Sequence, residues 1–193
     1  YVAVSYPTNT GGSNDKAGGS LVAVVATVDA TDVTFTPPPS AGGGGGGPQR
    51  TEFTRTLNKG QSYLAEMDFV GQDFTGWSIT ATNPVAVFSG NQCTNVPTSV
   101  TTCNHLIEQL PPTSELGTSF VAVSPATRAD AVYRVVASSD ATTVNHPGGP
   151  TVLGQGEFVE FAAPGAVEIT SDKPVLVAQY AKGLPGVVHT EQS

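Results

Sequence analysis

The chain has 193 residues, enough for one domain of ordinary size or two small ones, each with its own hydrophobic core. Its net charge of −8, with only eight lysines and arginines, lacks the basic stripe that phosphate backbones require, which argues against nucleic acids and anionic membranes as partners. Valine (25) and threonine (24) far outnumber leucine (9) and isoleucine (3), and 22 glycines and 15 prolines interrupt the chain. Because β-branched residues fit a pleated sheet, this composition predicts an all-β protein.

Short apolar runs that end at Gly, Pro, Asn or Asp predict strands along the whole chain. In the first half these runs are Tyr1–Ser5, Leu21–Thr27, Val33–Thr36, Thr51–Leu57, Ser62–Met67, Trp77–Thr80 and Val85–Ser89. In the second half they are Ser119–Val123, Ala131–Ser138, Thr142–Asn145, Glu157–Ala162, Ala166–Thr170 and Val175–Tyr180. Only Asn104–Leu110 could form a helical turn, which Pro111 would end. The longest apolar run, Leu21–Val28, is far shorter than the roughly 20 residues of a membrane span.

The two halves of the sequence resemble each other, which indicates a duplicated β unit. Residues 24–33 align with residues 135–144 at an offset of 111, and seven of the ten positions are identical. Three shorter matches keep the same order: residues 1–5 with 120–124, 57–60 with 153–156, and 79–87 with 169–177. We therefore predict an antiparallel β-sandwich built from two similar units, residues 1–118 and 119–193, that together form one domain.

The first unit carries two insertions that the second unit lacks. Residues 37–48 contain three consecutive prolines and six consecutive glycines, which predicts a solvent-exposed loop. The other insertion contains the stretch between the two cysteines and continues to Gly117. In both units an Ile-Thr pair, a short turn and a Pro-Val-x-Val run predict a hairpin whose second strand opens at Pro84 or Pro174.

Cys93 and Cys103 are the only cysteines, and they lie ten positions apart in a stretch rich in Thr, Asn and Pro. We predict a local disulfide, which requires an oxidising compartment and stabilises the fold by about 3 kcal/mol in the chain-entropy model. The alternative is a pair of reduced thiols or half of a metal site, for which the neighbouring sequence offers only His105 as a further soft ligand.

The sequence offers little for catalysis, because it contains no Gly-x-Ser-x-Gly motif and its three histidines share no metal-ligand spacing. His105 and Glu108 would share one face of a helical turn and are the candidates for a metal or acid–base site. The alternative interpretation is that both side chains bond to backbone groups of the disulfide loop.

Calcium would require several converging oxygen ligands, and the candidate pairs are Asp29 with Asp32 and Asp68 with Asp73. Asp29 and Asp140 occupy equivalent positions in the two units, which favours an Asx-type turn over a ligand. We therefore predict no metal, no other cofactor and no enzymatic activity.

Two aromatic residues are candidates for binding. Trp77 is the only tryptophan, and packing in the core is favoured for it over a role as a binding hot spot. Tyr1 begins a run that matches an internal strand, so this run could complete the sheet of a neighbouring molecule.

Several stretches of the chain resemble the N-terminal domain of IgGFc-binding proteins. The most specific is the block Pro84–Gly90 followed by Cys93, and then Cys103, His105 and the Glu-Gln-Leu-Pro-Pro run that ends at Pro112. The resemblance extends from about Tyr1 to Gly183 and implies an extracellular, β-rich, non-enzymatic module. The Pro/Gly-rich insertion departs from the family pattern, and the cysteine-dense repeats of animal members are absent, which suits a bacterial member.

These observations predict a secreted or cell-surface interaction or adhesion module that binds a protein or a glycan through loops and strand edges. A second hypothesis is a subunit of an extracellular filament or surface layer that assembles by donating the strand at Tyr1. An enzymatic hypothesis rests only on His105 and Glu108. Because the sequence starts at Tyr1 and shows no signal peptide, we interpret it as a mature or excised piece.

Overall fold

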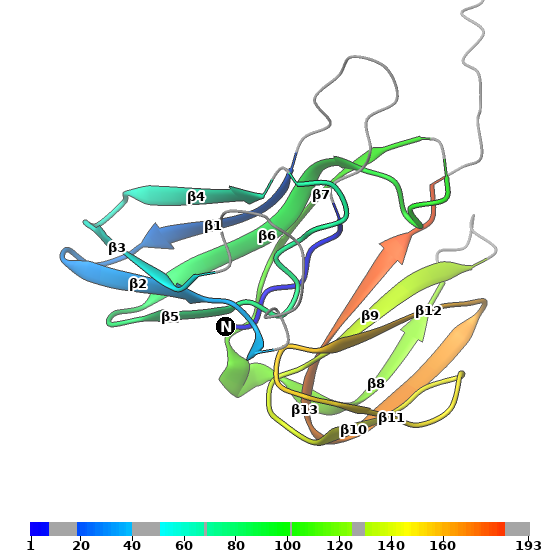
Figure 1. Cartoon of the computed structure of the whole chain (residues 1–193). Helices are drawn as coiled ribbons and strands as arrows, with labels where there is room; N and C mark the ends of the chain where they lie inside the picture. Colours follow the sequence, from blue (N-terminus) through cyan, green and yellow to red (C-terminus); the bar gives the residue numbers. More distant parts are fainter. Residues whose placement is uncertain (8–18, 40–50, 68, 101, 125–129, 184–193) are drawn as a thin grey trace, which may run out of the picture.

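The computed structural model describes residues 1–7, 19–39, 51–67, 69–100, 102–124 and 130–183. Within these residues the chain forms thirteen β-strands, all of whose pairings are antiparallel, and one short 3-10 helix, η2 (Thr113–Glu115) (Figure 1). The all-β prediction is therefore confirmed. No helix in this described part of the chain is long and apolar enough to cross a membrane.

The first half of the molecule is a β-sandwich of two sheets. Its strands are β1 (Ser20–Ala26), β2 (Thr31–Thr36), β3 (Phe53–Leu57), β4 (Ser62–Met67), β5 (Ser78–Ala81), β6 (Val85–Thr94) and β7 (Asn104–Gln109). One sheet has the order β4-β1-β6-β7 and the other the order β3-β2-β5. The backbone of Tyr1–Ala3 lies along β5, where Val2 bridges to Ser78 and the Ile79 N–H donates to the Tyr1 carbonyl (3.0 Å).

The second half contains β8 (Gly117–Val123), β9 (Ala131–Ala137), β10 (Thr142–Asn145), β11 (Thr151–Leu153), β12 (Phe158–Ala163) and β13 (Ala166–Ala181). The strand β13 belongs to both layers. Its first part, up to Ser171, pairs with β8 and β10, and its second part, from Val175, pairs with β9. The register shifts between Thr170 and Val175, where the strand passes from one layer to the other.

The predicted hairpins at Pro84 and Pro174 are wrong. The strands β5 and β6 pair with different partners, β2 and β1, so the turn at Pro84 carries the chain from one sheet to the other. At Pro174 there is no break, because β13 runs through this residue. The predicted strand Tyr1–Ser5 is reduced to the single bridge at Val2. Most of the Pro/Gly-rich insertion lies outside the described residues.

The strand pairings of the two halves recur at the offsets of the sequence repeat. In the first half Val24 pairs with Tyr63 and Val87, and Val2 with Ser78; in the second half Val135 pairs with Val159 and Val177, and Val121 with Glu168. Even the left-handed backbone of Ala30 (φ 53°) recurs at Ala141 (φ 51°). These contacts support the predicted duplication. The division into units remains a prediction, and β8 begins at Gly117, so a boundary after residue 118 would fall inside this strand.

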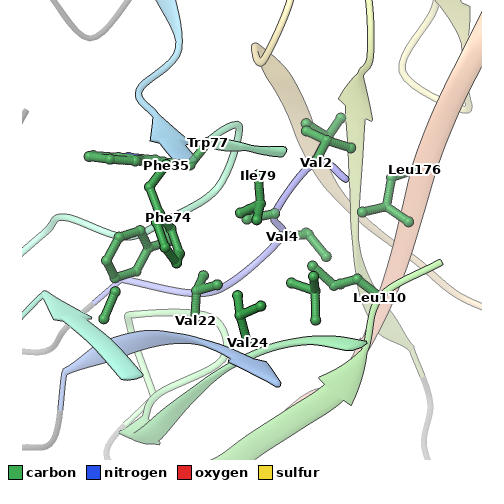
Figure 2. Packing of buried hydrophobic residues seen from close by; sticks show 14 of the residues in the cluster. Val2, Val4, Val22, Val24, Phe35, Phe74, Trp77, Ile79, Leu110 and Leu176 are labelled. Atoms are coloured by element: carbon green, nitrogen blue, oxygen red, sulfur yellow. The ribbon is translucent and has the colours of Figure 1, made fainter. Parts of the chain in front are cut away.

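Two hydrophobic clusters form the core, and β9 separates them. The second cluster contains the odd-numbered residues of β9, such as Tyr133 and Val135. Val132 and Val136 point to the opposite side and belong to the first cluster, together with Leu176 of β13. Figure 2 shows Leu176 beside Leu110 and Val4 of the first half. All seven residues of β9 are buried, because both faces of its sheet are covered.

The backbones of the two halves also touch directly. A Cβ atom at Gly76 would lie 1.9 Å from the carbonyl oxygen of Gly156, and one at Gly156 would lie 2.6 Å from the carbonyl oxygen of Gly76. Both residues have positive φ angles, 85° and 74°. Only glycine suits this contact, which fixes how closely the halves approach.

Candidate functional site

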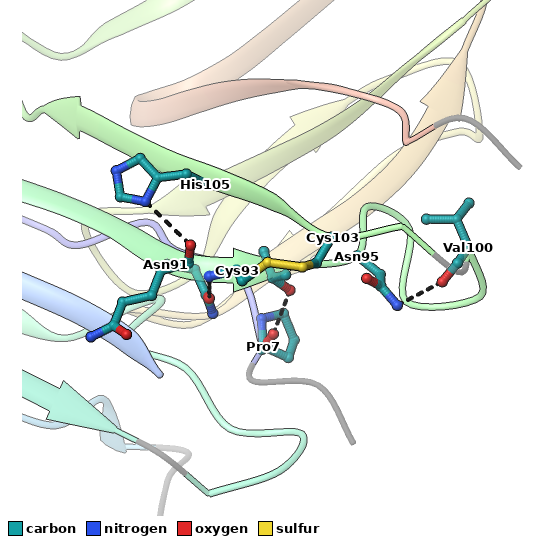
Figure 3. Close-up of a disulfide and its surroundings, with 9 residues drawn as sticks. Pro7, Asn91, Cys93, Asn95, Val100, Cys103 and His105 are labelled. Carbon is teal, nitrogen blue, oxygen red and sulfur yellow. Dashed lines mark hydrogen bonds between the residues drawn. A yellow bond between two sulfur atoms is a disulfide. The ribbon is translucent and has the colours of Figure 1, made fainter. Parts of the chain in front are cut away.

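The predicted disulfide between Cys93 and Cys103 is confirmed (Figure 3). The loop that it closes is anchored to the N-terminal segment and to the residues that follow β13. The Thr94 hydroxyl donates to the carbonyl of Pro7 (2.6 Å), and the Gly183 N–H donates to the carbonyl of Val96 (2.7 Å). Val96 itself is buried in the first core cluster. The disulfide therefore secures a loop that joins the N-terminal segment to the end of β13.

His105 and Glu108 do not form a common site. The segment that could have formed a helical turn is the strand β7, in which residues three positions apart point to opposite faces. His105 Nδ1 lies 3.3 Å from the carbonyl oxygen of Gln92. Glu108 lies on the opposite face, exposed at the rim of a groove described below.

The acidic candidates for calcium are engaged elsewhere. Asp29 Oδ1 accepts a hydrogen bond from the Lys59 N–H (2.9 Å), and Asp32 Oδ1 accepts one from the Thr56 hydroxyl (2.6 Å). Asp140 likewise accepts a hydrogen bond from the Gln155 N–H (2.9 Å). The equivalent residues Asp29 and Asp140 therefore each bond to a neighbouring turn and not to the turn in which they lie. Asp68 lies outside the described residues. Among those described, no three His, Cys, Asp or Glu side chains are grouped to hold a metal ion.

Trp77 and Tyr1 both pack into the molecule. Trp77 is only 3% exposed and contacts the rings of Phe53 and Phe74. Tyr1 is half-buried, and its hydroxyl donates to the carbonyl of Val85 (2.6 Å). Trp77 also lies in the wall of an aromatic cavity of about 210 Å³ between β3 and β4, so a binding role for either residue stays a prediction.

A buried ionic network joins the two halves, and sequence reasoning missed it. Arg134, in the middle of β9, is 4% exposed. Its Nη1 atom lies 2.8 Å from Asp73 Oδ2 and donates to the Ser5 carbonyl (2.9 Å), while its Nε donates to Glu160 Oε2 (2.6 Å). The signal in the sequence was an arginine within an apolar strand, at the position where the repeat has Ala23.

Two tyrosines complete this network. The Tyr180 hydroxyl donates to the Ser5 carbonyl (2.9 Å), and the Tyr6 hydroxyl donates to Glu160 Oε1 (3.2 Å). The guanidinium of Arg134 stacks over the Tyr6 ring, 4.3 Å from its centroid. Every ionic group in the network has a partner, so its first role is to hold the halves together.

The surroundings of the network favour the charged form of Arg134 and the neutral, protonated forms of Tyr6 and Tyr180. Burial is the largest single effect and by itself would lower the pKa of Arg134. The charge of Asp73, together with the hydrogen bonds that Arg134 makes to Asp73 and Glu160, outweighs burial, and the pKa is raised. Burial raises the pKa of Tyr180 and of Tyr6 well above the ordinary value, and for Tyr6 the charge of Glu160 adds to the effect. Both phenols therefore remain protonated at physiological pH.

An open groove of about 440 Å³ lies beside this network, between β7 of the first half and β8 and β13 of the second. Most of its walls are apolar. Side chains and backbone of Val4, Leu106, Leu110, Leu116, Phe120, Val175, Leu176 and Val177 line it, and Glu108 and Glu115 are the only charged residues among the described ones at this groove. Two of the strands that border it, β7 and the second part of β13, are edge strands in the described part of the chain. The groove is the best-formed candidate for a ligand site.

Comparison with known proteins identifies the family of the chain. The family profile described as IgGFc binding protein matches residues 1–191. This chain belongs to the IgGFc-binding family. The human IgGFc-binding protein is 42% identical to it over 93 residues, which are 46% of this chain and 2% of the human protein. The chain therefore spans a very small part of that relative. No solved structure matches the chain.

The stretch by which the IgGFc-binding resemblance was identified borders the groove. Its Pro84–Gly90 block forms most of β6, and its Cys103–Pro112 stretch forms β7 and the turn that follows. Ser89, Gly90 and residues 106–111 all line the groove. The most specific part of the sequence pattern thus folds into one wall of the candidate site.

Proposed function

We propose that this IgGFc-binding-family chain is an extracellular, non-enzymatic module that binds another protein, and that the groove between its halves holds the ligand. The observation that carries the proposal is the groove itself, an open concave surface of mainly apolar side chains with two carboxylates at its rim. Concave apolar surfaces with a few polar groups are the usual sites of recognition. Membership of a family named for binding supports the same assignment.

The disulfide supports a location outside the cell or on its surface, because such bonds persist in oxidising compartments. The human relative is named for binding to IgG Fc, so an Fc fragment is the first protein to test. Adhesion to a surface through such a protein contact would be one outcome of this activity.

The experiment measures binding of the purified chain to a panel by surface plasmon resonance. The panel contains an IgG Fc fragment, the same fragment without its glycans, mucus glycoproteins and an array of free glycans. We expect saturable binding to at least one protein that persists after glycan removal. Leu116→Asp, which places a charge in the groove, should weaken that binding at least tenfold, whereas Val152→Asp on the exposed strand β11 should leave it unchanged. Binding to free glycans only, or to nothing, would contradict the proposal.

The alternative of a filament built by donation of the N-terminal strand has less support. The backbone of Tyr1–Ala3 already bonds to β5 of the same chain, and the side chains of Val2, Val4 and Tyr6 are buried in its core. Removal of residues 1–7 should therefore destabilise the fold itself. The filament hypothesis requires that this deletion abolish polymers seen by electron microscopy while the remaining chain stays folded.

A further inference from the structure

We propose that the groove receives an extended peptide segment of a partner protein, which adds as a strand to the free edge of β13 and carries apolar residues alternating with lysine or arginine. This inference rests on the proposed function and names the kind of ligand that the same site takes.

The second part of β13 has a neighbour on one side only in the described structure. It pairs with β9 along residues 175–181, while on its other side the backbone pairing with β8 ends at the pair Gly117 and Val175. Beyond this pair only a side-chain contact remains, in which Gln179 Nε2 donates to the carbonyl of Val123 (2.9 Å). In the first half the equivalent strand β6 has a neighbour on both sides, because β7 covers this edge. The internal repeat therefore shows a strand occupying, in one half, the position that stands open in the other.

The backbone of β13 offers hydrogen-bonding groups at this open edge. Ala137 exchanges hydrogen bonds with the turn before β12, through its own N–H (3.0 Å) and its carbonyl (2.9 Å). The odd-numbered residues of β9 thus bond toward β12 and the even-numbered ones toward β13. Their partners Leu176 and Ala178 bond back to β9, so the backbone groups of Val177 and Gln179 point to the groove.

The first half shows the same arrangement with the strand in place. The N–H of Leu110, the residue directly after β7, donates to the carbonyl of Val87 (2.8 Å), and Val87 is equivalent to Val177 in the alignment of the halves. An incoming antiparallel strand would use the corresponding groups of β13. Tyr180 stands at the position of Gly90, where a Cβ atom would lie only 1.9 Å from the carbonyl oxygen of Leu106, so the added strand should end near Gln179.

The side chains beside the edge favour an apolar and basic segment. On the floor of the groove, Phe120 of β8 and Val177 of β13 are only partly buried and pack on the second core cluster, so alternate apolar residues of a bound strand would cover them. Glu108 and Glu115 are exposed at the rim, and no lysine or arginine is among the described residues that line the groove. A basic side chain on the bound strand would meet these carboxylates.

The test uses synthetic seven-residue peptides with blocked ends and the intact chain, with affinity measured by fluorescence anisotropy. We expect the peptide of alternating valine and lysine to bind at least tenfold more tightly than the peptide of alternating valine and glutamate. The double variant Glu108→Lys with Glu115→Lys should remove or reverse this preference, and Glu168→Lys, an exposed change on β13 away from the groove, should preserve it. Equal binding of the two peptides, or binding of neither at millimolar concentration, would overturn the inference.

Backbone pairing has its own test. N-methylation of alternate peptide nitrogens removes the donors on one edge of the strand, and we expect at least one of the two possible patterns to weaken binding tenfold. Val177→Pro removes one donor of β13 at the open edge while leaving its pairing with β9, and should also weaken binding, with folding checked by thermal unfolding. Full binding of both methylated peptides would overturn strand addition.

The two proposals can fail separately. If a protein ligand binds the chain but neither Val177→Pro nor the double charge reversal affects it, the proposed function stands and the strand inference is wrong. If glycans displace the valine–lysine peptide and no protein ligand is found, protein binding itself is wrong.

Discussion

The two halves of this molecule share a strand plan and differ most on one sheet face. On β1, β4 and β6 this face carries Ala23, Leu64 and Gly90, and Leu64 is 52% exposed. At the equivalent positions of β9, β12 and β13 the second half carries Arg134, Glu160 and Tyr180, each of which hydrogen-bonds to the first half.

This difference separates residues that build the core clusters from residues of the outer face that join the two halves. Some inward residues, such as Val24 and Val135, are identical in the two halves, and others, such as Val22 and Tyr133, differ, but all of them are buried in a core cluster. The outward residues are uncharged in the first half (Ala23, Leu64 and Gly90), whereas at the same positions the second half has two charged residues and a tyrosine. In the described structure the outer face of the first half lacks such groups at these positions and stays open. The edge of β13 lacks a covering strand and stays open as well.

Removal of the arginine should have the largest effect on the contact between the halves. Arg134→Ala leaves the buried carboxylate of Asp73 without its partner, and we expect a loss of about 3–5 kcal/mol in the free energy of unfolding, measured by urea denaturation. The matched change Arg55→Ala removes only an exposed arginine stacked on Phe53 and Tyr63, and should cost at most about 1 kcal/mol. Equal losses for the two variants would mean that the network does not hold the halves together.

Removal of the disulfide should come next, since it exists only in the first half. We expect the double variant Cys93→Ala with Cys103→Ala to lose about 3 kcal/mol, because an eleven-residue loop is no longer closed in the unfolded chain. Reduction of the unmodified chain with dithiothreitol should give a similar change in the urea midpoint. If neither treatment moves the midpoint, the loop is held by its hydrogen bonds alone.

Alkaline pH should weaken the interface through its tyrosines. Their pKa values are raised in the folded chain, so their contribution to stability is complete below about pH 10 and is lost as the pH rises above it. The expected slope is about 1.4 kcal/mol per pH unit for each tyrosine. Tyr180→Phe should reduce this slope, whereas Tyr63→Phe, outside the network, should leave it as in the unmodified chain; equal slopes would contradict the assignment.

Substitution of the two alanines with a left-handed backbone conformation should change the stability equally if the halves follow one plan. Ala30→Gly and Ala141→Gly each relieve a positive φ angle, and we expect each to stabilise the chain by up to about 1 kcal/mol. Calorimetry should show the two effects within about 0.5 kcal/mol of each other. Opposite signs would show that the equivalent turns are built differently.

Calcium should have the smallest effect. The aspartates at the equivalent turns already accept backbone hydrogen bonds, from Lys59 in one half and Gln155 in the other. We expect millimolar calcium chloride to shift the unfolding temperature by less than about 1 °C, which is below the effect of binding at a dedicated site. A shift of several degrees that EDTA reverses would show a site that these bonds do not reveal.

Much of the fold could be predicted from local patterns, and the errors have a common cause. The strands Ser62–Met67 and Thr142–Asn145 are found with the predicted bounds, because alternation and turn residues mark them clearly. The turn at Pro84 looked like a hairpin because alternation does not say which sheet a strand joins. His105 and Glu108 looked like a pair only under a helical period, which the strand β7 does not have.

The candidate site was less accessible from the sequence. The groove is made by strands β7 and β8 together with β13, which is far from them in the chain, and no residue in it is unusual by itself. Arg134 was visible as a polar residue within an apolar strand. Its partners Asp73 and Glu160 could not be named, because only the docking of the halves brings them within 2.8 Å and 2.6 Å of the guanidinium.

The sequence by itself determined that this chain is all-β, that it repeats, that its two cysteines pair and that it resembles a family of binding proteins. These features depend on local alternation, short spacings and aligned positions, all of which are written along the chain. The tertiary structure alone decided that one sheet is buried on both faces, that an arginine joins the halves and that a groove opens beside β13. These three features depend on how the halves dock, which is set by contacts between residues distant in sequence.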